Sequence, residues 1–519
     1  MSTDSQSNNS KRIAKNTLLL YFRMIFIMVI TLYTSRVVLA ALGVEDFGIY
    51  NVVGGVVAMF SVISGSLSAA ISRFLTYELG RNDESKLKLI FSTSVNIQIA
   101  LSLIILLLAE TVGLWFLNVK MNIAPERMEA ANWVFQCSII TFIINLISVP
   151  YNASIIAHEK MSAFAYVTVL EVVLKLLVVY LLLVSPIDKL QAYAILLMLV
   201  ALIIRLVYQV YCKKKFAECA YHLIFDKAIL KQMAAFAGWN FIGASAGVLR
   251  TQGVNVVINL FYGATVNAAR GISVQVNSAV TSFASNFMTA LNPQITKSYA
   301  AGDYNYMNKL LFQGARLSFY MLLFLSLPII IEAETILTVW LKLVPEHAVG
   351  FVQLILIFAM CEAISGPLIT AMLATGNIKK YQIIIGGTNL LNLPISYFLL
   401  KLFGFETFPE ITMVVAIVLS VICLLERLWL MREMINLDSI GFLKTVVFNI
   451  IVVTVIAAIV PYQIHTFTKE NIYLSLANII ICVLSSAIVI FFIGCSSQER
   501  KFVLDKVNMV KEKTLRHGK

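Results

Sequence analysis

The sequence predicts an all-α membrane protein of about fourteen transmembrane helices, and three observations support that prediction. Hydrophobic residues make up 59% of the 519 positions and charged residues only 13%, whereas a soluble domain carries roughly 25% charged residues. The apolar residues form runs of about twenty, the length that a helix needs to cross ~30 Å of hydrocarbon. These runs lack the alternating pattern of barrel strands, so helices must satisfy the backbone groups within lipid.

The expected spans follow one another through short connections, without an inserted soluble domain. They are 16–41, 47–75, 89–117, 131–156, 162–184, 191–212, 233–260, 264–292, 309–332, 348–373, 380–402, 410–431, 443–462 and 472–494. The first run is too long for the apolar part of a signal peptide, so we expect it to be retained as a helix.

The Lys and Arg residues concentrate in alternate connections, which predicts the orientation in the membrane. The connections that we assign to the cytoplasm are basic, and the linker 213–232 between helices six and seven is the longest of them. The outer connections hold only a few basic residues, namely Lys120, Arg127, Lys189, Lys342, Lys401 and Lys469. We therefore expect a multi-pass protein of the inner (plasma) membrane with both termini in the cytoplasm. The net charge of +12 then faces anionic inner-leaflet lipids, and nucleic-acid binding is not needed to explain it.

A weak internal repeat predicts the domain organisation. Tyr77 and Gly80 follow helix two at the spacing with which Tyr299 and Gly302 follow helix eight. Six helices per half give both halves the same orientation, so the repeat predicts two parallel six-helix lobes. The expected parts are an N-lobe, the amphipathic linker, a C-lobe, two additional helices and a basic tail, at 1–212, 213–232, 233–431, 432–494 and 495–519.

The seven cysteines are scattered and form no CxxC or Cys/His cluster. We therefore expect no disulfide, no metal site and no cofactor.

Ionisable residues inside the spans each need an explanation, because a charge at the bilayer centre costs at least ~2.5 kcal/mol. Arg73, Arg205 and Arg427 lie toward cytoplasmic ends, where snorkelling to the headgroups is one explanation. Arg36 and Arg270 lie near outer ends.

Five ionisable residues lie deeper in their spans. Arg23 and Arg316 lie about 10 Å from the cytoplasmic side, and Lys175 lies near the centre, one turn after Glu171. The i,i+4 spacing predicts a pair between Glu171 and Lys175, whose role is either structural or functional. Glu362 is a central carboxylate without a neighbouring base, which makes it a candidate for gating or proton coupling.

Helix eight carries a polar stripe along its whole length. Its members fall within an arc of about 120° on a helical wheel, and they are Asn267, Arg270, Asn277, Ser278, Thr281, Ser285 and Thr289. Such a stripe faces either water in a cavity or a hydrogen-bonded seam with another helix. Helix seven is also polar, but Arg250 lies opposite Asn255 and Asn259, so the wheel leaves open whether Arg250 faces the same cavity.

The segment Ser35–Tyr50 (SRVVLAALGVEDFGIY) resembles the S-R…LG…(F/Y)G signature of bacterial polysaccharide flippases of the O-antigen, oligosaccharidyl-lipid type. These belong to the multidrug/oligosaccharidyl-lipid/polysaccharide (MOP) exporter superfamily, together with lipid II flippases and multidrug-and-toxin extruders. The resemblance implies two lobes in a V, with helices one, two, seven and eight lining a central cavity. It also implies that an undecaprenyl-pyrophosphate-linked oligosaccharide is moved across the inner membrane by alternating access. Only Arg36, Gly43 and Gly48 carry over from the motif itself.

The excess of basic over acidic residues within the spans favours an anionic substrate, because arginine can donate two hydrogen bonds to pyrophosphate oxygens. We expect Arg23, Arg36, Arg73, Arg270 and Arg316 to bind the anionic headgroup, and Asn267, Asn277, Ser278, Thr281 and Ser285 to contact the sugars. Glu171, Lys175 and Glu362 are candidates for coupling or gating. The expected partners are the lipid-linked oligosaccharide, anionic inner-leaflet lipids and a polysaccharide polymerase.

Two other functions stay open. A multidrug or organic-cation extruder of the same superfamily needs carboxylates and aromatic walls, and helix one has no acidic residue. A membrane-embedded polymerase or ligase usually needs a sizeable outer loop, and the outer loops here are short. We therefore expect a transporter rather than an enzyme.

Overall fold

The computed structural model is all-α, with no strand in the residues that it describes. Those residues are 3–58, 61–119, 123–222, 224, 226–341, 344–403, 408–468, 471–497, 499–501 and 504. Within these ranges some side chains lie outside the description, and the expected site residues Arg36 and Asn267 are among them.

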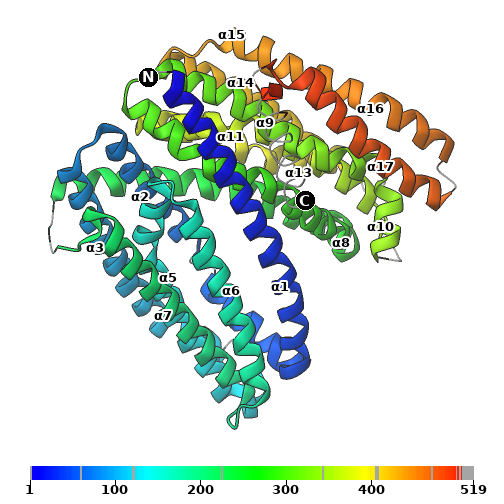
Figure 1. The fold of residues 1–519 in the computed structure, drawn as a ribbon. Helices are drawn as coiled ribbons and strands as arrows, with labels where there is room; N and C mark the ends of the chain where they lie inside the picture. Colours follow the sequence, from blue (N-terminus) through cyan, green and yellow to red (C-terminus); the bar gives the residue numbers. More distant parts are fainter. Residues whose placement is uncertain are drawn as a thin grey trace, which may run out of the picture. The chain divides into compact units, whose positions relative to one another are not determined.

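Most helices of the first half follow the expected spans (Figure 1), but α1 runs through 16–41 into the beginning of 47–75, and α2 contains the described remainder of that span. Their bounds are α1 Thr3–Ala58, α2 Ser61–Arg81, α3 Glu84–Leu108, the π-helical turn η1 Ala109–Gly113, α4 Leu114–Val119, the 3₁₀ turn η2 Pro125–Arg127, α5 Met128–Ala157, α6 Met161–Leu183, α7 Lys189–Lys215 and the 3₁₀ turn η3 Ala217–Cys219.

The second half continues with the long helix α8. The bounds are α8 Lys227–Ala300, α9 Tyr304–Ile331, α10 Ala333–Leu341, α11 Ala348–Thr375, α12 Lys379–Leu390, α13 Asn392–Phe403, α14 Ile411–Ile435, α15 Ser439–Phe442, the π-helical turn η4 Leu443–Val447, α16 Phe448–Thr468, α17 Ile472–Val489 and the π-helical turn η5 Ile490–Gly494.

Short polar side chains set where several helices begin. Asp83 accepts a hydrogen bond from the backbone N–H of Lys86 at the start of α3, and Asp188 accepts one from Leu190 at the start of α7, both at 3.0 Å. Asp226 does the same for Ala228 of α8, at 2.8 Å. These carboxylates satisfy N–H groups that have no partner inside the helix.

The first helix is interrupted at Gly43, where φ is 81° and ψ is 171°. Glycine adopts this positive φ without the penalty that a Cβ atom imposes. The break falls between the expected spans 16–41 and 47–75, and it gives the motif residue Gly43 a structural role.

Helix α8 contains both of the expected spans 233–260 and 264–292, and it doubles back between them. A straight helix of 74 residues would be about 110 Å long, yet both of its ends pack on α2. The rings of Phe74 and Phe236 are 5.8 Å apart, and those of Tyr77 and Tyr299 are 6.3 Å apart. Phe236 and Tyr299 therefore lie near one end of α2 although most of α8 separates them.

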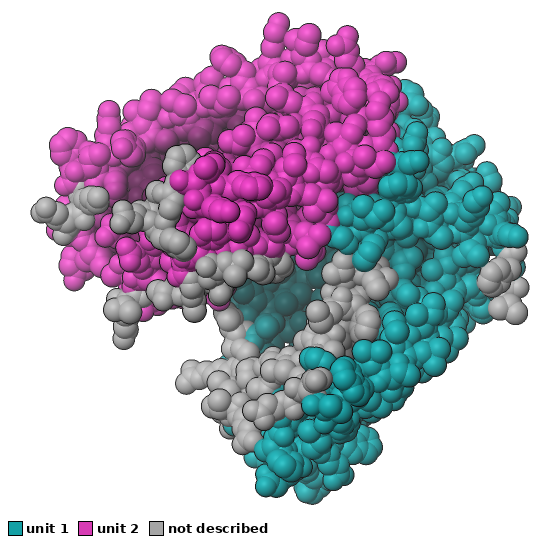
Figure 2. Space-filling view, turned by 180° about the vertical axis from the view of Figure 1, so that it is seen from behind, with its two compact units in different colours: residues 1–245, 289–304, 373–379 teal, residues 246–288, 305–372, 380–519 magenta. Residues whose placement is uncertain are grey.

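The chain divides into two compact units, which Figure 2 shows in different colours. Unit 1 comprises 1–245, 289–304 and 373–379, and unit 2 comprises 246–288, 305–372 and 380–519. A boundary between the compact units lies inside α8, after Ser245. Packing of both ends of α8 against α2 is the physical reason, and the internal repeat in the sequence does not reveal it.

In unit 1, α5 packs against α7, α2 and α3, while α1 packs against α6. The core of this unit includes Leu117, Val134 and Phe135, all at least 98% buried. In unit 2, α16 packs against α17 and α13 against α14. Ten helical segments of the described chain are long and apolar enough to cross a membrane. The chain is a multi-pass membrane protein.

Candidate functional site

Arg23 is a half-buried cation on α1 that no described carboxylate contacts. Its guanidinium lies over the ring of Phe164 on α6, with 4.4 Å from Cζ to the ring centroid. Its Nε atom is buried and has no hydrogen-bond partner. Glu171 and Tyr208 act on it only through longer-range electrostatics. The face of the Phe164 ring is the main contact that stabilises the charge. The Nε–H group can still donate a hydrogen bond to a ligand.

Arg73 on α2 lies among aromatic rings. Its Cζ is 4.6 Å from the ring centroid of Phe74 and 4.7 Å from that of Tyr77. Its Nη2 atom donates a 2.8 Å hydrogen bond to the backbone oxygen of Ala374, and its Nε atom is buried without a partner. The side chain therefore attaches segment 373–379 to unit 1.

Arg270 is the most buried of the expected headgroup arginines whose side chains the structure describes, with only 4% of the residue exposed. Its Nη2 atom donates a 3.2 Å hydrogen bond to the backbone oxygen of Thr251. Its Nε and Nη1 atoms are buried and have no partner. An unsatisfied buried donor typically costs ~1–3 kcal/mol, more when it is charged. An anion that accepts a hydrogen bond from either nitrogen would reduce that cost.

Arg316 is paired with the chain's own tail. Its Nη2 atom donates to both carboxylate oxygens of Glu499, at 2.8 and 2.9 Å. Glu499 also accepts a 2.7 Å hydrogen bond from the N–H of Ser496, and its own N–H donates to the Ser496 hydroxyl. This reciprocal arrangement is a capping box, so the carboxylate is held in place while it neutralises Arg316. Arg316 lines a cavity of about 510 Å³ in unit 2.

The described members of the polar stripe on α8 mostly hydrogen-bond within the helix. Ser278 donates to the backbone oxygen of Val274 at 2.9 Å, and Thr281 donates to that of Asn277 at 2.7 Å. Their hydroxyl protons are therefore committed, while the oxygens keep acceptor capacity. The side-chain oxygen of Asn277 is buried without a partner, and Ser285 is exposed within the isolated chain.

Glu171 and Lys175 form the pair that their spacing predicts. Lys175 Nζ donates to Glu171 Oε1 at 2.6 Å. Both residues line a cavity of about 270 Å³ inside unit 1, where Tyr50, Thr141 and Asn145 are further lining residues.

Glu362 has a base beside it, contrary to the expectation from sequence. Arg250 Nη1 lies 3.3 Å from Glu362 Oε1, and the hydroxyl of Ser420 donates to the same oxygen at 2.8 Å. Arg250 also donates to the amide oxygen of Asn389 at 2.8 Å. Arg250, Asn389 and Ser420 come from α8, α12 and α14, so local sequence could not reveal this network around Glu362. Arg250 thus lies against α11 and α12 within unit 2.

Snorkelling does not describe Arg427. The residue is only 2% exposed, and its Nη1 atom donates a 2.9 Å hydrogen bond to the hydroxyl of Ser365.

Arg205 lies over the ring of Tyr151, with 4.2 Å from its Cζ atom to the ring centroid, and has a buried Nη1 atom without a partner.

Sequence reasoning missed a buried carboxylate, Glu159, between α5 and α6. Its side chain is 1% exposed and accepts from Lys297 of α8 at 2.7 Å and from Arg12 of α1 at 2.8 Å. Gln294 donates to it as well. Its φ of 58° is unusual for a residue with a Cβ atom. Glu159 thus joins three segments of unit 1 that are far apart in the sequence.

A second missed cluster surrounds Arg127, at the end of unit 1 that the charge pattern assigns to the outside. Arg127 Nε donates to Asp46 at 2.8 Å, and its Nη1 atom donates to Asp188 at 2.7 Å. Burial alone raises the pKa of Asp188, but the hydrogen bonds from Arg127 and from the backbone outweigh it, so the pKa lies below its usual range. Asp46 belongs to the motif segment Ser35–Tyr50, so the motif itself could have pointed to this cluster.

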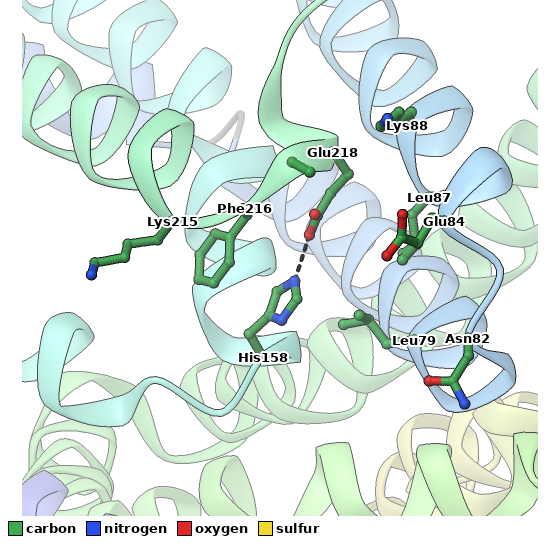
Figure 3. Close-up of a pocket in the computed structure, with 10 residues that line it drawn as sticks. Leu79, Asn82, Glu84, Leu87, Lys88, His158, Lys215, Phe216 and Glu218 are labelled. Carbon is green, nitrogen blue, oxygen red and sulfur yellow. Dashed lines mark hydrogen bonds and ion pairs between the residues drawn. The ribbon is translucent and has the colours of Figure 1, made fainter.

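The linker between α7 and α8 contributes a third missed contact, shown in Figure 3. His158 Nε2 and Glu218 Oε1 lie 2.5 Å apart, and the imidazole stacks on Phe216 with ring centroids 4.1 Å apart. Burial raises the pKa of Glu218, but the hydrogen bonds with His158 and the backbone, together with the charges of His158 and Lys88, outweigh it, and the pKa is lowered overall. These residues line a cavity of about 270 Å³.

Comparisons with known proteins identify the fold. No family model matches the chain. A 286-residue part is 22% identical to the uncharacterized membrane protein EpsK of Bacillus subtilis (strain 168), and the alignment covers 54% of this chain and 56% of that protein. The chain thus spans little more than half the length of this curated relative.

The similarity to solved structures is more extensive. A multidrug resistance MATE family transporter of the MOP superfamily, solved in an outward-facing conformation, covers 83% of this chain and 97% of its own, with a TM-score of 0.69 and 13% identity. A MATE structure in the bent conformation gives a TM-score of 0.71 at 12% identity over 85% and 98% of the two chains.

A third structure is a MOP superfamily transporter from Pyrococcus furiosus, for which a reversed polarity of the binding pocket is said to suggest a different function. It gives a TM-score of 0.66 at 13% identity and covers 84% of this chain and 96% of its own. The chain has the fold of MOP-superfamily transporters. The predicted all-α fold class and the resemblance to this superfamily are thereby confirmed at the level of the fold.

Proposed function

We propose that this protein is a transporter that flips an undecaprenyl-pyrophosphate-linked oligosaccharide across the inner membrane by alternating access, for surface polysaccharide biosynthesis. The observation that carries the proposal is Arg270, a buried cation with two donor nitrogens that no described group satisfies. A buried charge of this kind costs free energy in apolar surroundings unless an anion binds to it during the transport cycle.

The other expected headgroup residues differ in how available they are. Arg23 and Arg73 each have a buried, unpartnered Nε atom and no hydrogen-bonded carboxylate among the described residues. Arg316 forms an ion pair with Glu499. It would bind a substrate only after this ion pair is broken. The side chain of Arg36 lies outside the description. Arg23 and Arg73 of unit 1 and Arg270 of unit 2 are therefore the arginines of the expected set that remain available to an anion.

The polar stripe supports a sugar-bearing substrate. The oxygens of Ser278 and Thr281 can accept hydrogen bonds while their protons stay within the helix. Sugar hydroxyls are donors as well as acceptors, so they match such a surface. Asn277, with an unpartnered buried amide oxygen, adds a further acceptor.

The second candidate is a multidrug or organic-cation extruder, which the fold shared with multidrug resistance transporters favours. A cationic drug needs an available carboxylate. Glu171 and Glu362 are each paired with a base in this chain, at 2.6 and 3.3 Å. Neither carboxylate of the expected site is therefore available to a cation, whereas Arg270 keeps two unpartnered nitrogens, and this difference favours an anion.

Deletion of the gene in the producing strain tests the proposal. We expect loss of surface polysaccharide and accumulation of lipid-linked repeat units on the cytoplasmic leaflet, with both restored by the wild-type gene. Efflux of a cationic dye should be unchanged. Impaired dye efflux without accumulation of repeat units would instead establish the extruder.

A further inference from the structure

A cavity of about 380 Å³ lies within unit 1 and was not foreseen from the sequence. Its size falls in the range of ~300–1,000 Å³ that small-molecule sites occupy. Three segments line it: the end of α2, the beginning of α8 and the turn between α11 and α12. The residues that matter for its chemistry are Arg73, Phe74, Phe236, Trp239, Gly376 and Lys379.

The lining combines two cations with aromatic rings. Arg73 lies over Phe74, and Lys379 Nζ lies 5.6 Å from the ring centroid of Trp239. No acidic residue is among the described residues that line the cavity. An occupant that neutralises both cations and also covers the rings must carry a negative group next to an apolar one.

The turn at Gly376 fits closely around the guanidinium of Arg73, as two observations indicate. Gly376 has a φ of 77°, and a Cβ atom there would lie 2.5 Å from Arg73 Nη2. The same nitrogen donates to the oxygen of Ala374 two residues earlier. A side chain at position 376 would therefore displace the guanidinium from its present place.

We propose that this cavity binds the phosphate headgroup of an amphiphile, with phosphate oxygens at Arg73 and Lys379 and the adjoining hydrocarbon on Phe74, Phe236 and Trp239. The inference rests on the proposed function, because the pyrophosphate of the lipid-linked substrate is the ligand that it names. In the orientation that the charge pattern predicts, α2 ends and α12 begins at the cytoplasmic side. The cavity then lies toward the leaflet from which the headgroup is collected.

The neighbouring residue Lys380 provides a matched control. It donates to both carboxylate oxygens of Glu433, at 2.7 and 2.6 Å, and lies over Trp429 in unit 2. Lys379 and Lys380 thus share charge and sequence position, but only Lys379 lines the cavity.

The test measures binding of geranylgeranyl pyrophosphate to the purified full chain by calorimetry. Loss of a charge-assisted contact typically weakens binding tenfold or more. We expect such a loss for Lys379→Gln and wild-type affinity for Lys380→Gln. Geranylgeraniol, which lacks the phosphates, should bind at least tenfold more weakly than the pyrophosphate. Equal affinity of Lys379→Gln and the wild type, or of the alcohol and the pyrophosphate, would overturn the inference.

A second pair of variants addresses the turn. Gly376→Ala should weaken binding, whereas Gly302→Ala should not. Gly302 has a similar φ of 73°, but nothing lies within 4 Å of a Cβ atom placed there. The pair therefore separates displacement of Arg73 from backbone strain, and equal effects of the two substitutions would count against the site.

Competition identifies the source of the phosphate. Nanodiscs of phosphatidylglycerol should compete weakly with geranylgeranyl pyrophosphate, and inorganic pyrophosphate should bind but less tightly than the prenylated form. Displacement by phosphatidylglycerol at equal concentration would overturn the assignment to a lipid-linked pyrophosphate. Failure of these binding tests leaves the deletion phenotype unaffected, so it contradicts the cavity and not the proposed transport. Absence of accumulated repeat units in the deletion strain contradicts the transport itself.

Discussion

Arg270 and Thr251 are joined by a hydrogen bond of 3.2 Å, from the guanidinium Nη2 to the backbone oxygen, across the turn of α8. The bond links two residues that a straight helix would hold about 28 Å apart. It also positions the Nε and Nη1 atoms of Arg270, which have no partner. The same residue therefore helps to hold the doubled helix and presents an unsatisfied cation.

Arg270→Ala should reduce surface polysaccharide export about thirtyfold, because a lost charge-assisted contact costs ~2 kcal/mol. Arg270→Lys should restore export in part, since lysine keeps the charge but loses the planar fork. Export is measured with the protein level checked by immunoblot. Lys380→Gln is the control, because Lys380 is a cation of the same unit that Glu433 already neutralises.

Arg23→Ala should impair export to a similar degree, because Arg23 has no hydrogen-bonded carboxylate among the described residues. Wild-type export by both Arg23→Ala and Arg270→Ala would eliminate an anionic headgroup as their ligand.

The sequence predicted the helices well, because runs of apolar residues and breaks such as Gly43 are local signals. It could not predict which segments form each unit, since contacts such as Phe74 with Phe236 join distant positions. The same limit applied to the candidate site. The pair of Glu171 and Lys175 is readable from i,i+4 spacing, whereas the partner of Glu362 comes from another helix.

Burial was a second quantity that the sequence did not provide. Arg427 and Arg270 both lie near helix ends in the sequence, yet they are 2% and 4% exposed. Position along a span measures depth in the bilayer and not whether protein covers the side chain. Glu159, in a short connection, had no sequence signal of burial, and it became apparent only as the junction of α1 and α8 with the loop after α5.

Glu159→Ala should destabilise the purified protein by about 3 kcal/mol, because it leaves Lys297 partly buried without its carboxylate. Thermal unfolding in detergent measures the effect. Glu84→Ala is the control, since Glu84 is an exposed residue in the first turn of α3. A similar unfolding temperature for the two variants would contradict a structural role for the Glu159 cluster.

Arg127→Ala should destabilise the protein by about 2 kcal/mol at neutral pH through loss of its bonds to Asp46 and Asp188. The pKa of Asp188 is lowered in the folded state, so its contribution is complete above the unfolded value of ~3.9 and is lost as the pH falls through the folded value. The difference in unfolding temperature between wild type and Arg127→Ala should therefore be constant from pH 7 to about pH 5. It should shrink only below about pH 4, and a difference that vanished by pH 6 would exclude the Asp188 carboxylate as its source.

The last prediction concerns orientation, which follows from the alternation of Lys and Arg between connections. The connection 118–130 is expected outside, and the turn between α2 and α3 is expected in the cytoplasm. Single cysteines at Asn122 and Asn82, each in a background without the seven native cysteines, should differ in labelling by a membrane-impermeant thiol reagent. In intact cells Asn122→Cys should be labelled and Asn82→Cys should not, whereas both should be labelled after the membrane is opened. Asn82 is exposed and has a φ of 56°, so a lack of labelling in intact cells would reflect the membrane barrier and not burial. The reverse labelling pattern would show that the orientation is the opposite of the predicted one. The cavity at Arg73 and Lys379 would then lie at the outer side, where it could not bind a substrate from the cytoplasmic leaflet.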